Sequence, residues 1–91
     1  MEKKENAIVR VGRWEQVYDR LREAAKQDPA SVHQDDTLRE LLQQLTEYYE
    51  GGQWLEDYRQ DARGMLPPTM KRGVLSQDGI YDLLSLLKEH E

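Results

Sequence analysis

The chain has 91 residues, of which 34% are charged and 37% hydrophobic, and its formal net charge is −5. A chain of this length forms one domain with a thin core, which excludes a multi-domain enzyme. It contains no cysteine, so disulfide bridges, thiolate nucleophiles and cysteine-ligated metal sites are also excluded. Residues 1–10 lack the apolar centre of a signal peptide, and no apolar run approaches the ~20 residues that cross a bilayer. We therefore expect a single soluble, cytoplasmic domain over residues 1–91.

The N-terminal third predicts one long amphipathic helix over residues 3–27. Its apolar side chains recur with steps of three and four at Ala7, Val11, Trp14, Tyr18, Leu21 and Ala25. Arg10, Arg13 and Arg20 lie along one flank of this helix. Because Glu15 and Asp19 lie close by and neutralise them, we expect this flank to be solvated.

A second helix follows, with two alternative starts. The Asp28-Pro29 pair fits an N-cap followed by a proline at the first helical position, and Thr37 to Glu40 fits a capping box. Gly51-Gly52 ends the helix, because helix C-termini favour a residue that tolerates positive φ. One stripe, about 120° wide on a helical wheel, holds Leu38, Leu41, Leu42, Leu45, Tyr48 and Tyr49.

Two shorter helices are predicted in the C-terminal half. The first spans residues 53–62 and carries Trp54 and Tyr58 on one face. Gly64 and the two prolines after it then interrupt regular structure until Ser76, which is a favourable N-cap for a helix over residues 77–89.

The apolar arc of this last helix is unusually wide, at about 220°, because Tyr81 and Leu86 fall outside the main stripe. One neighbour cannot cover such an arc. The helix therefore either lies centrally among the others or docks on a second chain. We predict an all-α fold: a small bundle with a long antiparallel helical hairpin, a short helix, a proline loop and a C-terminal helix packed at the open end.

Candidate chemistry is sparse. Asp57 and Asp61 share a helix face beside Trp54, as paired carboxylates do in glycosidases, but a small bundle rarely has a cleft for a sugar. We favour an ion pair from one of these carboxylates to Lys71 or Arg72. The two histidines do not have the Glu-x-x-His spacing of bundle metal sites, and no glycine loop suits a phosphate. We expect no catalytic residue, metal or cofactor.

The aromatic and acidic side chains are the remaining signal. Aromatic residues are enriched at protein interfaces, and residues 28–61 hold nine acidic side chains against two basic ones. Most of the aromatic surface is expected in the core, with Tyr48 or Tyr49 the better candidate for exposure. The predicted partner-binding residues are Glu47, Tyr48, Tyr49, Glu50, Trp54, Glu56, Asp57, Asp61, Tyr81 and Leu86.

The second half of the chain carries an ordered set of motifs: Tyr48-Tyr49, Trp54, Asp57-Tyr58, Gly64-x-Leu66-Pro67 and Gly73-Val74-Leu75-Ser76. This block, residues 45–87, resembles a small bacterial family filed as domain of unknown function 4298. The resemblance implies a short, cytosolic, helical protein and no chemistry. Pro68 and Gly79 depart from the family pattern, which has a polar residue and a helix former at these positions. Within the block we expect Val74 and Leu75 to fill the gap between the last two helices, with Trp54 against them.

These features predict a non-enzymatic module that presents a helical, aromatic and acidic surface to a protein partner, which can be a second copy of the chain. The alternative is a small acidic regulator, of phage or mobile-element type, that occupies the basic nucleic-acid-binding surface of a target protein. The least favoured function is a small enzyme or ligand-binding domain that uses Asp57 and Asp61. Direct nucleic-acid binding is not expected, because the acidic middle of the chain repels phosphate backbones and leaves only the N-terminal helix for such a contact. Membrane association is not expected either, because no apolar run is long enough to cross a bilayer.

Overall fold

The computed structural model describes residues 6–91, and every regular element within them is helical. Helix α1 (Ala7–Gln27) is followed by the short α2 (Ser31–Gln34), then by α3 (Asp36–Glu50) and α4 (Gln53–Ala62). A loop leads from α4 to a 3-10 turn, η1 (Gly73–Leu75), and on to α5 (Gln77–Glu89). The predicted all-α fold is confirmed, although η1 was not predicted.

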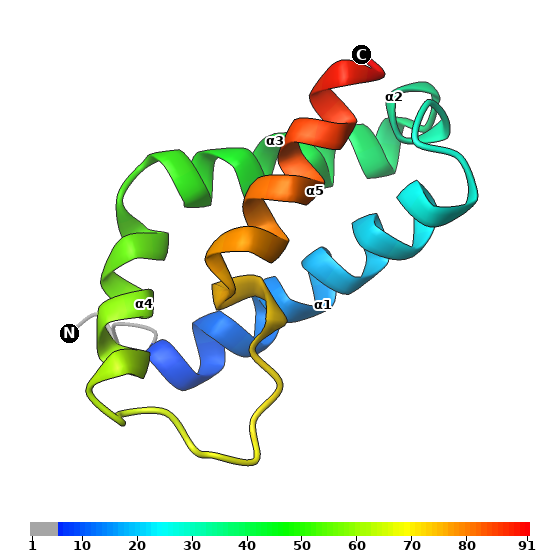
Figure 1. Cartoon of the computed structure of the whole chain (residues 1–91). Coiled ribbons are helices and arrows are strands. Elements are labelled where there is room, and N and C mark those ends of the chain that lie inside the picture. Colours follow the sequence, from blue (N-terminus) through cyan, green and yellow to red (C-terminus); the bar gives the residue numbers. More distant parts are fainter. Residues whose placement is uncertain (1–5) are drawn as a thin grey trace, which may run out of the picture.

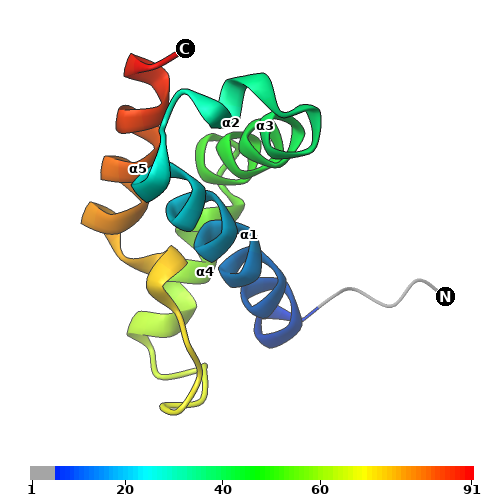
Figure 2. The ribbon, with the colours of Figure 1, turned by 90° about the vertical axis from the view of Figure 1, so that its right-hand side faces the viewer.

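The first four helices form a wedge, and the C-terminal part of the chain fills its opening. α1 and α3 run in opposite directions and diverge from α2, and α4 closes the wide end (Figure 1). α5 crosses this opening and packs against α1 and η1, as Figure 2 shows from the side. This is the predicted helical hairpin with the C-terminal unit at its open end.

Side-chain caps set the first helix boundaries. Asn6 accepts a hydrogen bond from the backbone N–H of Val9 at 2.9 Å and is the N-cap of α1, which begins at Ala7. Residues 3–5 of the predicted helix lie outside the described residues. Asp28 accepts a hydrogen bond from the N–H of Ala30 at 3.1 Å. The N-cap of α2 is nevertheless Ala30, which makes no side-chain cap hydrogen bond, and Pro29 lies in the turn before the helix. The predicted helix start at Asp28-Pro29 is therefore wrong.

The remaining boundaries follow short-range signals as well. The alternative start at Thr37 is wrong, because Asp35 caps α3 by accepting the N–H of Leu38 at 3.0 Å. Gly52 has a φ of 97° and redirects the chain from α3 into α4. Ser76 caps α5 as predicted, and both α4 and α5 have their predicted bounds.

The core lies where α1, α3, α5 and η1 meet. The predicted filling of the gap by Val74 and Leu75 is confirmed, since both are buried. Trp54 is also buried and donates its indole N–H to the carbonyl oxygen of Val74 at 2.8 Å. The largest hydrophobic side chains with full burial are Val11, Leu21, Val32, Leu45, Val74, Ile80 and Leu87.

Gly79 lies at a close approach between α5 and Tyr18 of α1. A Cβ at this position would be 2.6 Å from the hydroxyl oxygen of Tyr18 and 3.3 Å from Ser76. Tyr18 is buried, with an exposed fraction of 3%. The close approach explains why glycine replaces the helix former that the family resemblance leads one to expect.

Candidate functional site

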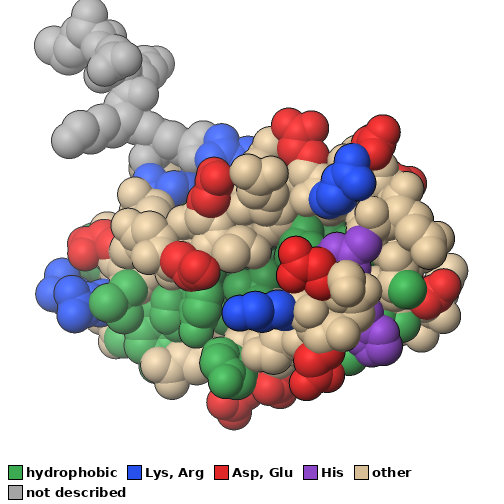
Figure 3. Space-filling model, turned by 90° about the horizontal axis from the view of Figure 1, so that it is seen from above, with side chains coloured by type: hydrophobic (Ala, Val, Ile, Leu, Met, Phe, Trp, Pro, Cys, Tyr) green, Lys and Arg blue, Asp and Glu red, His purple; other side chains and the backbone are tan. Residues whose placement is uncertain are grey.

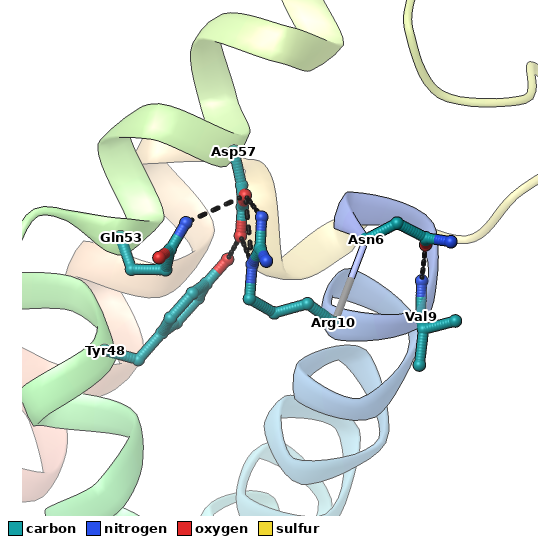
Figure 4. Close-up of polar contacts among 6 residues, drawn as sticks. All are labelled: Asn6, Val9, Arg10, Tyr48, Gln53 and Asp57. Carbon is teal, nitrogen blue, oxygen red and sulfur yellow. Dashed lines mark hydrogen bonds and ion pairs between the residues drawn. The ribbon is translucent and has the colours of Figure 1, made fainter. Parts of the chain in front are cut away.

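Asp57 is the centre of a buried polar cluster that joins three helices (Figure 4). Its carboxylate is fully buried. Arg10 of α1 binds it through two nitrogens, with Nε 2.9 Å from Oδ2 and Nη2 2.5 Å from Oδ1. Tyr48 of α3 donates its hydroxyl at 2.7 Å, and Gln53 of α4 donates its amide at 3.3 Å. The paired geometry of guanidinium and carboxylate satisfies the buried charge and fixes the two groups relative to each other.

This cluster corrects three sequence-based expectations. Asp57 and Tyr48 are buried and therefore do not lie on the open surface predicted to bind a partner. Arg10 pairs with Asp57 and is not part of a solvated flank. Burial raises the pKa of Tyr48, and its hydrogen bond to the Asp57 carboxylate raises it further. The Tyr48 hydroxyl therefore remains protonated and acts as a donor.

Asp61 has a different partner, although it shares a helix face with Asp57. Its Oδ1 lies 2.5 Å from Nη1 of Arg72, and both side chains are partly exposed. The predicted ion pair from α4 to the proline loop is thus confirmed for Asp61 and Arg72. Since each carboxylate has its own cation, the two are not arranged as a free pair across a cleft.

Glu15 is a buried acidic residue that the sequence analysis placed on the solvated flank of α1. Its exposed fraction is 7%, and Oε1 accepts the backbone N–H of Val74 at 2.8 Å. Burial raises the pKa of Glu15, and the hydrogen bond from Val74 partly opposes this. Glu15 lies four residues after Val11 and three before Tyr18, so its position on the apolar stripe was a readable signal of burial.

Trp54 is a second aromatic residue whose predicted place at the surface is corrected. Its exposed fraction is 5%, and its ring packs between Tyr49 and Tyr58, with centroid distances of 5.0 Å and 5.3 Å. Tyr49 is half-buried, whereas Tyr48 is buried, so Tyr49 is the more exposed of the pair. The predicted site residues that do lie exposed are Glu47, Glu50, Glu56, Tyr81 and Leu86.

A groove of about 840 Å³ lies between α3 and α5. Its floor is apolar, because Leu42 and Tyr49 of α3 and Leu84 of α5 are half-buried against the core. Tyr81 stands at its edge with 60% of its surface exposed. The remaining lining is polar and comprises His33, Arg39, Gln43, Thr46, Glu47, Glu50, Ser85, Lys88 and Glu91.

The groove combines an apolar centre with a charged border. Seen from above, hydrophobic side chains form a band across part of this face, and acidic and basic side chains lie along its border (Figure 3). The lining residues of α5 are Tyr81, Leu84, Ser85 and Lys88, which is the spacing of one helix face. Leu42 and Leu84 were not among the predicted site residues, since a leucine on a helical stripe is indistinguishable from a core leucine in the sequence.

Tyr81 and Leu86 do not form one surface. They are about 140° apart around the axis of α5, at 100° per residue. Tyr81 faces the groove, whereas Leu86 does not line it. The wide apolar arc predicted for α5 is therefore only partly covered by α1 and η1, and it leaves exposed side chains on two different flanks.

A second, more open hollow of about 490 Å³ lies beside the Asp57 cluster and is lined by Arg10, Arg13, Trp14, Gln44, Glu47, Tyr48 and Gln53. Trp14 stacks on Tyr48 with a centroid distance of 4.8 Å, so the aromatic surfaces here already cover each other. The groove between α3 and α5 is the larger of the two, and it has more apolar lining residues. Neither Asp57 nor Asp61 lines either cavity.

Residues 6–91 contain no cluster of three or more histidine or acidic side chains that could hold a metal ion. In the same range, no buried side-chain nitrogen or oxygen lacks a hydrogen-bond partner. None of the described helices has the length and apolarity needed to span a membrane.

Comparison with protein families matches residues 11–90 to a family described as a domain of unknown function, DUF4298. The chain belongs to this family. The DUF4298 match begins in α1, whereas the resemblance seen in the sequence covered residues 45–87. Contacts of Glu15 with Val74 and of Tyr18 with Gly79 explain why α1 belongs to the same unit. Searches of curated proteins and of solved structures found no match to this DUF4298 protein.

Proposed function

We propose that this DUF4298 protein is a non-enzymatic protein-interaction module of the bacterial cytoplasm, and that the α3–α5 groove holds its partner. The observation that carries the proposal is the apolar floor formed by Leu42, Tyr49 and Leu84, with the exposed ring of Tyr81 at its edge. The cellular location is part of the proposal and is supported only by the family resemblance.

The physical basis is the arrangement of apolar and polar groups. An apolar side chain that enters the groove gains about 25 cal/mol for each Å² of apolar surface removed from water. Tyrosine is a frequent anchor at interfaces, because it offers a large ring with little conformational entropy to lose. The polar lining then gives orientation. The helical spacing of the lining residues suits a partner that lays one helix face along the groove.

The polar clusters support a non-enzymatic role. Asp57 is held by Arg10, Tyr48 and Gln53, which leaves it engaged within the fold. Arg72 neutralises Asp61. Of the five predicted acidic site residues, only Glu47, Glu50 and Glu56 are exposed. An acidic surface for a basic target would therefore have three carboxylates and not five. The groove is therefore the better-supported site.

Site-specific crosslinking in the native host would test the proposal. A photoreactive benzoylphenylalanine at position 81 replaces one exposed aromatic ring with another, and a matched control carries it at the exposed Gln16 of α1. The expected result is a defined crosslinked protein product from position 81 that is absent from position 16. Equal labelling at both positions, or none at either, would refute the groove as an interaction surface.

A further inference from the structure

The two ends of the groove carry charges of opposite sign. Near α2, the lining side chains are Arg39 and Lys88, with Glu91 as the one acidic residue; at the other end are Glu47 and Glu50. Arg39 and Glu50 are eleven residues apart on α3, which is about 16 Å along the axis. The groove therefore has an electrostatic direction.

Two contacts fix the basic end. Nε2 of His33 lies 2.6 Å from the carbonyl oxygen of Leu87, which places the last turn of α5 beside α2. Nη1 of Arg39 lies 3.4 Å from the carbonyl oxygen of His33. Arg39 also contacts Asp36 at 2.6 Å, but this pair is exposed on both sides and such pairs contribute little. Its guanidinium has further donors for a second carboxylate.

We infer that the occupant of the groove is the same groove of a second copy of this chain, related by a two-fold axis. This inference rests on the proposed function and names the partner. A two-fold axis through the middle of the groove reverses its direction. Arg39 and Lys88 of one copy then face Glu47 and Glu50 of the other, and the same pairing occurs a second time.

The shape of α5 supports the same arrangement. Tyr81, Ser85 and Lys88 form a ridge on the groove side of this helix, and the chain itself leaves Tyr81 60% exposed. In the two-fold pair, the Tyr81 ring of each copy enters the groove of the other and covers its apolar floor. A different protein would need both an apolar ridge and acidic and basic groups placed to face the basic and acidic ends of the groove. A second copy of this chain has both.

Charge reversal gives a test that does not depend on one variant. One variant reverses the basic end (Arg39→Glu with Lys88→Glu), a second reverses the acidic end (Glu47→Lys with Glu50→Lys), and a third combines all four substitutions. Sedimentation velocity and light scattering from 10 to 500 µM would give the mass of each, against 10.7 kDa for one chain. Circular dichroism would show that each remains helical.

We expect the natural sequence to dimerise, and each two-site variant to have a dissociation constant at least ten-fold higher. An equal mixture of the two should form heterodimers, and the four-site variant should recover self-association, because both restore opposite charges across the axis. A monomer at 500 µM would overturn the inference. A dimer whose dissociation constant is unchanged by these substitutions would overturn it as well. A monomer that still yields a crosslinked product with another protein at position 81 would overturn self-pairing and leave the proposed function in place.

Discussion

Replacing Gly79 with alanine tests how closely α5 is seated on α1. In an exposed helix this substitution stabilises a protein by about 1 kcal/mol, because alanine loses less backbone entropy than glycine on folding. Here the added Cβ would lie 2.6 Å from the Tyr18 hydroxyl oxygen and 3.3 Å from both Cβ and Oγ of Ser76. One of these groups, or α5 itself, must move.

The cost of that movement exceeds the gain. Tyr18 is 3% exposed, so its ring is enclosed by packed neighbours and has little room to withdraw. Inserting a methyl group into a packed core typically costs about 1 to 3 kcal/mol. After the propensity gain, we expect Gly79→Ala to lower the free energy of unfolding by about 1 kcal/mol, which is about 4 to 8 °C in Tm for a domain of this size.

Urea titration at constant pH would measure this, with Tyr18→Phe as the matched control background. Removing the hydroxyl removes the 2.6 Å contact and leaves the ring in place. In that background, Gly79→Ala should therefore stabilise the protein by up to about 1 kcal/mol. The reasoning fails if Gly79→Ala stabilises the natural sequence, or if its effect is the same in both backgrounds.

Further substitutions separate buried from exposed contacts. Asp57→Ala should cost about 3 to 5 kcal/mol, because it leaves the Arg10 guanidinium without its buried partner, whereas Asp61→Ala should cost about 1 kcal/mol or less; equal costs in urea titration would contradict the burial difference. Trp54→Ala should cost about 3 to 5 kcal/mol, and a loss below about 1 kcal/mol would show that the ring is not part of the core. Burial raises the pKa of Glu15 above its ordinary value of 4.5, so the native state binds the carboxyl proton more tightly than the unfolded state. The contribution of Glu15 to stability is therefore present below the pKa of the unfolded state and falls as pH rises through the pKa of the native state. The free energy of unfolding of Glu15→Gln, less that of the natural sequence, should therefore increase between about pH 4 and pH 7, and a difference that does not change with pH would refute the buried state of Glu15.

The C-terminal elements were predictable because their signals are local. Ser76 and the Gly51-Gly52 pair act within one helical turn, and α4 and α5 have the bounds that these residues indicate. The start of α3 was misread, since Asp35 and Thr37 are both good caps and only the folded chain shows which of them is used. Short-range chemistry thus determined most of the helices but not the choice between neighbouring caps.

The polar contacts between α1 and the rest of the chain could not be predicted in the same way. Arg10 and Asp57 are 47 residues apart, and Glu15 is 59 residues from Val74. In a chain that is 34% charged, many carboxylates could pair with each arginine, and the separation in sequence does not indicate which of them does. Only the ion pair between Asp61 and Arg72, which are eleven residues apart, was within reach of local reasoning.

The dependence of α1 on distant residues has a consequence for synthesis of the protein. When α1 leaves the ribosome, the carboxylate that neutralises Arg10 and the amide that binds Glu15 have not yet been made. A nascent chain that ends before η1 would present an apolar stripe with no cover, which is the kind of surface that chaperones and proteases recognise. We therefore expect folding to be completed in one step after translation, and more slowly than in a hairpin of two neighbouring helices.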